Sequence, residues 1–389
     1  MIKNRYLSPF IQEDLKKKMV FLGGPRQVGK TTLAKLILKS FEHALYYSWD
    51  NRADRKELLA EKWPAASATI VLDELHKYRF WKKWIKGEFD KHGHNLHFFV
   101  TGSARLDIYR KGGDSLQGRY HYYRLHPFSL GEASNYGCKQ IPQNELSLSF
   151  KSPKDILAAL LHFGGFPEPF IEQNEKELRR WQSERFDRFF REDIRDLENI
   201  RELSSLELMT DMLHERAAQS LSLNSLREDL EVSHKAVTHW LQILERLYYI
   251  FRIPPYTAKK IRSLKKENKI YLWDWALAPN APARYENMIA SHLLKFCHYL
   301  QDVEGYRMDL YYLRDIDKRE VDFLVTCNGR PWFAVEAKTD DTTPSPALRY
   351  FAKRLKIPFL YQVTLNGDHD FVQEGIRIVG ARQFLANLV

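Results

Sequence analysis

The feature that most constrains this chain is a glycine-rich stretch near its start, GGPRQVGKTT at residues 23–32. It contains Gly24-x-x-x-x-Gly29-Lys30-Thr31, which is the Walker A pattern without a mismatch. An apolar run at residues 19–22 precedes it, and a helical pattern follows it. This context predicts a P-loop between a strand and a helix, and with it a parallel sheet covered by helices.

Each part of this loop has a predicted contact with a nucleotide. Glycines let backbone N–H groups wrap around phosphates, and the start of the following helix attracts the same anions. Lys30 is expected to neutralise the β- and γ-phosphates, and the Thr31 hydroxyl to ligate Mg²⁺. We therefore predict that ATP is contacted by Gly24, Pro25, Arg26, Gln27, Val28, Gly29, Lys30, Thr31 and Thr32.

Two further strand-like runs extend the predicted site. The run at residues 69–72 ends in Asp73 and Glu74, which is the Walker B pattern. Asp73 is expected to hold Mg²⁺, and Glu74 to polarise the attacking water. The run at residues 96–101 ends at Thr101, and either Thr101 or Ser103 could sense the γ-phosphate. A plain turn at the end of the strand is the alternative for this second run.

Three arginines follow these strands, namely Arg105, Arg119 and Arg124. An arginine finger stabilises the charge that develops during phosphoryl transfer. Arg119, after Gly118, is the best candidate, although any of the three could be a surface charge. If Arg119 acts on a neighbouring copy, the chain would form a dimer or a ring.

The surrounding residues resemble a family of AAA+-like ATPases of bacteria and archaea, in which a C-terminal domain of unassigned function follows the P-loop domain. The resemblance rests on LDELHKYRFWKKWIKGEFD and on VTGSARLDIYRKGGDSLQGRYHYYRLHPFSLGE. Further matching pieces are GGFPE at residues 164–168, KIYLWD at 269–274, EVDF at 320–323 and EAK at 336–338. The sensor strand lacks the asparagine of better-known AAA+ proteins, so the residue that positions water stays open.

Residues 223–247 predict a helix–turn–helix. Leu223, Leu226 and Leu230 fit the inner face of one helix, and Ser233 fits the cap of a second. Two strand-like runs and the basic loop KKIRSLKKEN follow, which completes a winged-helix pattern. The second helix could present His234, Lys235, Thr238 and His239 to a DNA groove. Packing inside the protein or against a partner is an equally good reading.

The C-terminal residues predict a restriction-endonuclease-like fold. Asp322 lies on one expected strand, and Glu336 and Lys338 lie on the next, on the same face because strand residues alternate. Asp322 and Glu336, with Glu286 from a preceding helix, could hold Mg²⁺ or Mn²⁺. Lys338 could stabilise the attacking water and the charge on a phosphate. Such a domain can also keep its fold without cutting, so cleavage stays open.

The charge distribution points to a polyanionic partner. The formal net charge is +10, and residues 1–150 hold 25 Lys and Arg against 15 Asp and Glu, whereas residues 151–389 hold 35 of each. A basic surface attracts nucleic acid, although it can also only tune solubility. The sequence has no apolar run long enough to span a membrane and no signal peptide, and its three cysteines are far apart. These features predict a cytoplasmic protein with no membrane partner.

Together these patterns predict an α/β chain of three domains: a P-loop ATPase domain at 1–150, a helical and winged-helix domain at 151–280, and a restriction-endonuclease-like domain at 281–389. The leading hypothesis is a Mg²⁺-dependent ATPase that handles DNA, and it leaves metal-dependent cleavage by the last domain open. The alternative is a slow ATP-gated switch or scaffold that binds a protein or DNA without cutting. A transcription regulator is a third reading, which the neutral charge of residues 151–389 weakens.

Overall fold

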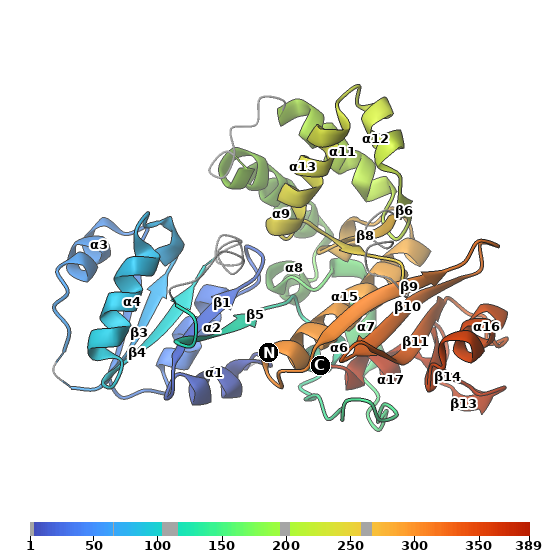
Figure 1. Ribbon diagram of the computed structural model, residues 1–389, viewed down its shortest axis with the longest axis horizontal. Helices are drawn as coiled ribbons and strands as arrows, with labels where there is room; N and C mark the ends of the chain where they lie inside the picture. The colour runs from blue at the N-terminus through green and yellow to red at the C-terminus, as the bar shows by residue number, and fades with distance from the viewer. Residues whose placement is uncertain (1–3, 65, 103–115, 195–202, 258–266) are drawn as a thin grey trace. The chain divides into compact units, whose positions relative to one another are not determined.

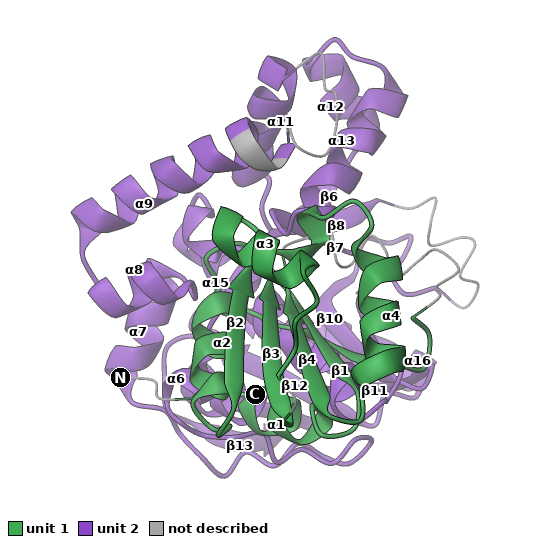
Figure 2. Cartoon of the chain, turned by 90° about the vertical axis from the view of Figure 1, so that its left-hand side faces the viewer, with its two compact units in different colours: residues 1–126 green, residues 127–389 purple. Residues whose placement is uncertain are grey.

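The computed structural model describes residues 4–64, 66–102, 116–194, 203–257 and 267–389. The chain divides into two compact units, residues 1–126 and residues 127–389 (Figure 2). Each unit is described here by itself.

Unit 1 is built on a five-stranded sheet in which all strands are parallel. The strands lie in the order β2-β3-β4-β1-β5. Their bounds are Met19–Gly23 for β1, Ala44–Ser48 for β2, Ala68–Asp73 for β3, Leu96–Thr101 for β4 and Tyr120–Arg124 for β5. The helices around them are α1 (Ser8–Asp14), α2 (Lys30–Leu38), α3 (Arg52–Leu59), the short 3-10 turn η1 (Leu75–Lys77) and α4 (Trp81–His92) (Figure 1).

Strand alternation assigns the two faces of this sheet. Ile70 and Leu72 of β3 join one core with Phe98 of β4 and with Trp81 and Ile85 of α4. The intervening residues, which include Asp73, therefore face the opposite side. Helix α2 packs on β3 and β4 through its own buried residues Leu33, Ala34 and Ile37, which lie outside that core. The strands predicted at 19–22, 69–72 and 96–101 are confirmed, whereas β5 was not expected.

The first part of unit 2 is mainly helical. Its helices are α6 (Leu130–Ala133), α7 (Lys154–Phe163), α8 (Pro167–Glu172), α9 (Glu175–Arg188), the π-helical turn η3 (Phe189–Ile194), α11 (Leu203–Glu215), α12 (Leu223–Asp229) and α13 (His234–Arg246). The helix–turn–helix predicted over 223–247 is present as α12 and α13. The Ser233 hydroxyl caps α13 by accepting from the Ala236 N–H at 3.1 Å.

A small antiparallel sheet accompanies these helices, in the order β6-β8-β7. Its strands are β6 (Ser220–Leu221), β7 (Ile250–Ile253) and β8 (Asn268–Leu272). The central strand β8 pairs on both sides, with Lys269 opposite Ser220 of β6 and opposite Ile253 of β7. Most of the basic loop predicted as a wing, residues 258–266, lies outside the described residues, and the winged-helix assignment stays a prediction.

The last part of unit 2 is a mixed six-stranded sheet in the order β13-β14-β12-β11-β10-β9. Its strands are β9 (Met308–Arg314), β10 (Glu320–Cys327), β11 (Arg330–Lys338), β12 (Phe359–Thr364), β13 (Asp370–Gln373) and β14 (Ile376–Gly380). The helices are η4 (Trp275–Leu277), α15 (Ala281–Asp302), α16 (Pro346–Leu355), α17 (Ala381–Phe384) and the turn η5 (Leu385–Asn387). The long helix α15 packs along β9, β10 and β11 (Figure 1).

The division into units differs from the boundary that we predicted at residue 150. Residues 127–150 belong with the second unit because their polar groups are satisfied by C-terminal residues. The Gln140 amide donates to the Asn387 carbonyl at 2.7 Å, and the Leu146 N–H donates to the Tyr361 hydroxyl at 2.9 Å. The segment that we predicted to end the first domain is therefore hydrogen-bonded to C-terminal residues of unit 2. No helix in the described part of the chain is long and apolar enough to cross a membrane.

Candidate functional site

The P-loop follows β1 and turns through backbone conformations that glycine favours. Gly24 has φ 143° and Gly29 has φ 95°, and Gln27 between them has φ 61°. A Cβ atom on Gly24 would lie 2.4 Å from the Leu125 carbonyl oxygen, so the loop approaches β5 too closely for a side chain there. The backbone conformation of the loop therefore favours glycine at both glycine positions of the motif, Gly24 and Gly29.

Lys30 is the first residue of α2, and its ammonium group lies inside the loop. It donates to the carbonyl oxygens of Gly24 at 2.9 Å and Pro25 at 2.7 Å. The residue before the helix, Gly29, has no side chain with which to cap the N–H groups of the first turn. A cation and an uncapped helix start thus converge on one loop, and both favour a bound phosphate.

Asp73 joins the P-loop to the two neighbouring strands. Its Oδ2 atom accepts from the Thr31 hydroxyl at 2.9 Å and from the Tyr46 hydroxyl at 2.6 Å. Its Oδ1 atom accepts from the Thr101 hydroxyl. Asp73 is buried, and three hydroxyl groups from α2, β2 and β4 hold it in one orientation. The strand order explains this convergence, because β3 lies between β2 and β4 and all their carboxyl ends share one edge.

The Thr31 and Asp73 oxygens have a separation that suits Mg²⁺. Neighbouring ligands of an octahedral Mg²⁺ lie about 2.9 Å apart, because each Mg–O bond is about 2.0–2.1 Å long. Mg²⁺ is commonly bound by one or two carboxylates together with substrate phosphates rather than by a cage of protein ligands. The pair therefore fits the metal that we predicted, with Thr31 and Asp73 as its protein ligands.

Glu74 follows β3 and has a strained backbone. Its φ is 57°, which is uncommon for a residue with a Cβ atom, and its N–H donates to the Thr101 carbonyl at 3.0 Å. Its carboxylate lies 3.4 Å from the Lys77 ammonium and 3.6 Å from His76 Nε2. Left-handed conformations at polar residues concentrate at functional sites, which agrees with the role predicted for Glu74.

Other predicted residues fall in different places. Pro25 and Val28 are buried in the loop, Arg26 and Gln27 are half-buried, and Thr32 is exposed. Ser103 lies outside the described residues. Arg119 precedes β5 at the edge of the sheet opposite the P-loop, where its guanidinium pairs with Asp90 at 2.6 Å. Arg119 is therefore not at the phosphate site of its own chain, because β5 runs parallel to β1 and only its end, at Arg124, lies beside Gly23.

The structure adds two residues that the sequence did not single out. Tyr46 contacts Asp73, as described above, because it faces the same side of the sheet as Val71 and Asp73. Burial, and then the hydrogen bond to Asp73, raises the pKa of the Tyr46 phenol. Arg5 precedes α1 and donates to the Val28 carbonyl at 2.7 Å and to the His126 carbonyl at 2.5 Å. Arg5 thus connects the P-loop to the segment after β5.

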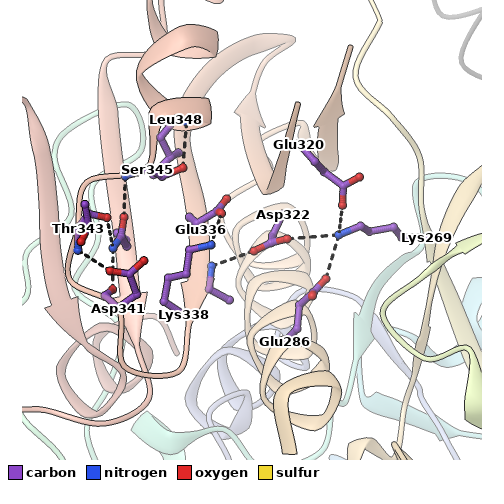
Figure 3. A network of polar contacts seen from close by, with 12 residues as sticks. Lys269, Glu286, Glu320, Asp322, Glu336, Lys338, Asp341, Thr343, Ser345 and Leu348 are labelled. Atoms are coloured by element: carbon purple, nitrogen blue, oxygen red, sulfur yellow. Dashed lines mark hydrogen bonds and ion pairs between the residues drawn. The ribbon is translucent and has the colours of Figure 1, made fainter. Parts of the chain in front are cut away.

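A second cluster of charged residues lies in unit 2 (Figure 3). The Lys269 ammonium, from β8, lies 2.7 Å from Glu320, 3.1 Å from Glu286 and 3.3 Å from Asp322. Glu320 and Asp322 come from β10 and Glu286 from α15. The Tyr271 hydroxyl, on the same side of β8 as Lys269, donates to Glu286 at 2.8 Å.

The three residues predicted on β10 and β11 lie side by side. The Lys338 ammonium is 2.9 Å from Glu336, and the Asp322 carboxylate accepts from the Ala337 N–H at 2.9 Å. The pairing register of β10 shifts between Val321 and Leu324, so Asp322 lies at a bulge. Bulges re-aim side chains next to functional sites, and this one directs Asp322 onto β11.

The electrostatics of this cluster follow from burial. Burial, and then the Asp322 charge, raises the pKa of Glu286 to about 7 and that of Glu336 to about 7. Burial alone would lower the pKa of Lys269, but Asp322, Glu286 and Glu320 together raise it. Lys269 therefore stays charged among the carboxylates.

The predicted three-carboxylate metal site is not formed. Among the described residues, no group of three or more His, Cys, Asp or Glu side chains is placed to hold a metal ion. Glu286 and Asp322 face Lys269, whereas Glu336 faces Lys338. Lys269 was not predicted, because only the fold brings β8 to these acids.

The helix–turn–helix presents the surface that we predicted. His234, Lys235 and His239 of α13 are exposed, and Thr238 is half-buried, with its hydroxyl donating to the His234 carbonyl at 2.8 Å. The opposite face of α13 is buried through Val237, Trp240, Leu241, Ile243 and Leu244.

Comparison with protein-family models divides the chain in a similar way. Residues 16–134 match the model described as AAA domain. Residues 154–285 match the Domain of unknown function (DUF8612), and residues 283–384 match the Domain of unknown function (DUF4143). Unit 1 is therefore similar to AAA domains, and P-loop domains of this kind use a nucleotide and usually Mg²⁺.

Related proteins extend the similarity over most of the chain. An uncharacterized protein of Mycobacterium tuberculosis is 21% identical over 385 residues, which cover 94% of this chain and 81% of that protein. An uncharacterized protein of Methanocaldococcus jannaschii is 21% identical over 310 residues, covering 76% of this chain and 67% of that protein.

Two solved structures align with part of the chain. The Walker-type ATPase PABY2304 of Pyrococcus abyssi aligns with a TM-score of 0.46 at 15% identity, covering 72% of this chain and 95% of that one. The RuvB Holliday junction branch migration motor of Thermotoga maritima aligns with a TM-score of 0.31 at 16% identity, covering 67% and 93%. Similarities this distant carry no inference about what this chain acts on.

Proposed function

We propose that this chain hydrolyses ATP in a Mg²⁺-dependent reaction at the P-loop of unit 1. The observation that carries the proposal is the 2.9 Å contact between the Thr31 hydroxyl and Asp73. It places a loop hydroxyl and a strand-end carboxylate, far apart in sequence, at the separation of two neighbouring Mg²⁺ ligands. A phosphate-binding loop alone would require no such contact.

The residues of the site would then have distinct roles. Lys30, now bonded to two loop carbonyls, would exchange these for phosphate oxygens and neutralise their charge. Thr31 and Asp73 would hold the metal, whose chemistry when bound is to neutralise charge between the β- and γ-phosphates. Glu74 would orient and polarise water, and Thr101 would keep Asp73 in position.

A Lys30→Ala variant tests the assignment. ATP hydrolysis should fall by at least about a hundredfold, because the variant removes the ammonium that lies inside the loop. Lys39→Ala is the matched control, because Lys39 is an exposed lysine at the far end of α2 and should leave the rate unchanged. If Lys30→Ala hydrolysed ATP at the wild-type rate, the reaction would not take place at this loop.

We further propose that hydrolysis is coupled to DNA binding. Unit 1 holds 24 Lys and Arg against 13 Asp and Glu, whereas residues 127–389 hold 36 against 37. The proposal is supported by this positive excess and by the exposed His234, Lys235 and His239 on α13. The alternative is a slow ATP-gated switch, assembled as a dimer or a ring, whose partner is a protein.

The two alternatives differ in how the ATPase rate responds to DNA. Under the DNA proposal, single- or double-stranded DNA should raise the rate several-fold, and the increase should shrink steeply as salt is added. A rate that DNA does not change would favour the protein switch. The DNA from the same tubes, run on a gel, should remain intact with Mg²⁺ or Mn²⁺, because the geometry around Lys269 does not favour cleavage.

A further inference from the structure

Lys269 occupies the centre of the carboxylate cluster in unit 2. An ammonium group has three N–H donors, and three carboxylates from two different elements surround this one, at 2.7, 3.1 and 3.3 Å. The side chain is 4% exposed, so solvent does not screen these contacts. Figure 3 shows Glu320, Asp322 and Glu286 pointing at the same nitrogen. The three N–H donors of Lys269 are thus matched by three carboxylate acceptors.

The lysine is also fixed in place. It lies on the central strand of the small sheet, with Ser220 and Ile253 opposite it on the two neighbouring strands. Its ammonium lies 5.8 Å from the centre of the Tyr312 ring on β9, which adds a cation–π contact. The neighbouring Tyr271 shares Glu286 as acceptor. A backbone paired on both edges leaves Lys269 little freedom to leave the acids.

A divalent cation would need the same oxygens. Asp322 already accepts from Lys269 through Oδ1 and from Ala337 through Oδ2, and Glu286 Oε1 accepts from both Lys269 and Tyr271. The Oε1 atom of Glu336 contacts Lys338. Its Oε2 atom is buried and has no hydrogen-bond partner. The residues present therefore do not fit a metal centre built on Glu286, Asp322 and Glu336.

We propose that Lys269 replaces the divalent cation in this carboxylate cluster, so that residues 267–389 use a built-in ammonium where a metal-dependent enzyme would use Mg²⁺ or Mn²⁺. The lysine joins β8 to β10 and α15 by charge, and the site takes a metal ion only when that charge is removed. The proposal is independent of ATP hydrolysis at unit 1.

Mn²⁺ binding to the full-length, nucleotide-free chain tests the proposal, because free Mn²⁺ is counted directly by its paramagnetic resonance signal. Wild type and Asp322→Asn should bind the same number of ions. Lys269→Met, which keeps the length of the side chain and removes its charge, should bind about one additional Mn²⁺. The double variant Lys269→Met/Asp322→Asn should lose that ion again. Any Mn²⁺ held at the P-loop is common to all four proteins and cancels.

Lys338→Met is the matched control. It removes the other lysine of the cluster, which pairs with Glu336, and should gain no ion because Lys269 remains. Thermal melting gives a second readout, in which saturating Mn²⁺ should raise the melting temperature of Lys269→Met by about 5 °C more than it raises that of wild type.

Two results would overturn the proposal. One is a Mn²⁺ ion bound by wild type and lost in Asp322→Asn. The other is a folded Lys269→Met, or its more polar counterpart Lys269→Gln, that binds no additional ion. If neither variant folds, the comparison of wild type with Asp322→Asn still decides whether the cluster binds a metal ion or is filled by Lys269.

Discussion

Two aspartates of this protein lie on apolar strands and differ in what surrounds them. Asp73 is the last residue of β3 and accepts from the hydroxyl groups of Thr31, Tyr46 and Thr101. Asp322 lies on an equally apolar strand, but its carboxylate meets the Lys269 ammonium and a backbone N–H. The first carboxylate contacts only neutral hydroxyl donors among these partners, whereas the second is already paired with a cation.

The difference between these donors indicates whether an acidic residue can bind a metal ion or instead forms an ion pair that stabilises the fold. A hydroxyl group that donates to a carboxylate can become a metal ligand itself or rotate away, so the cost of replacing it is small. A buried ammonium cannot be displaced without leaving its own charge unpaired, which is strongly unfavourable. The nature of the donors around the acid, more than the acid itself, therefore decides whether the site can take a metal.

The largest effect that tests this comparison is expected for Glu74→Gln. General-base catalysis typically contributes about 10²- to 10⁴-fold, so kcat should fall by that order while the affinity for ATP changes little. Asp50→Asn is the matched control, because Asp50 shares the Lys77 partner at 2.7 Å but lies outside the phosphate site. A Glu74→Gln protein that keeps half of its activity would remove Glu74 from the reaction.

The second effect concerns a buried histidine, since unit 2 also buries ionisable groups away from the carboxylate cluster. His292 on α15 accepts from the Leu130 N–H through Nε2 at 2.9 Å, and its Nδ1 lies 2.7 Å from the Met288 carbonyl, so the ring is neutral. Lys295, paired with Glu132 at 2.6 Å, is the charged group that faces it. Burial first, and Lys295 in addition, lowers the pKa of His292 to about 4.

Because the pKa of His292 is lower in the folded state than its unfolded value of about 6.5, the unfolded chain binds the proton first as the pH falls. The stability that the neutral ring contributes is complete above about pH 6.5 and is lost towards about pH 4. Between about pH 7 and pH 5 the loss should be about 2 kcal/mol, measured by denaturant unfolding of unit 2. His292→Gln, whose amide can both donate and accept, should flatten this dependence. An equal loss in that variant would assign it to other groups.

The elements of the phosphate site were largely predictable, because each signal is local. Each motif is contained in a segment of about ten residues: the glycine pattern, the apolar strand with two acids, and a third apolar strand. Parallel pairing then brings the ends of these strands together. Strand β5 was missed because its sequence, YHYYR, has no apolar alternation. The strands β13 and β14 were also not predicted individually. Both are short, and β13 is exposed throughout, so its sequence has no alternation of apolar and polar residues that would indicate a buried face.

The partners of the acids could not be predicted, because they come from distant parts of the fold. Lys269 reaches Asp322 across 53 residues, and Tyr46 reaches Asp73 across 27. Nothing in the local sequence of β8 distinguishes Lys269 from any other lysine near the start of a strand. Pairing of β2 with β3 fixes the Tyr46 contact, whereas Lys269 and Asp322 come from two different sheets. This is why the metal site predicted from Glu286, Asp322 and Glu336 is not formed, although Asp322 lies on β10 and Glu336 on β11.

The smallest effect is expected for Tyr46→Phe. The Tyr46 hydroxyl holds the Asp73 oxygen that also meets Thr31, so it acts on the metal through a ligand. Loss of such an outer partner typically weakens metal binding by about 10- to 100-fold, and the lower end is expected because Thr101 still holds Asp73. The Mg²⁺ concentration that gives half-maximal ATPase activity should therefore rise about tenfold, while kcat at saturating Mg²⁺ stays within about twofold.

Tyr47→Phe supplies the control for this titration. Tyr47 is the next residue on β2, and its ring packs on the opposite face of the sheet against Trp63, with centroids 6.3 Å apart. It removes the same hydroxyl group without touching Asp73, so its Mg²⁺ dependence should match that of wild type. If Tyr46→Phe also left the Mg²⁺ dependence unchanged, Asp73 would not be a metal ligand in this chain, and the contrast between its hydroxyl partners and the ammonium at Asp322 would lose its meaning.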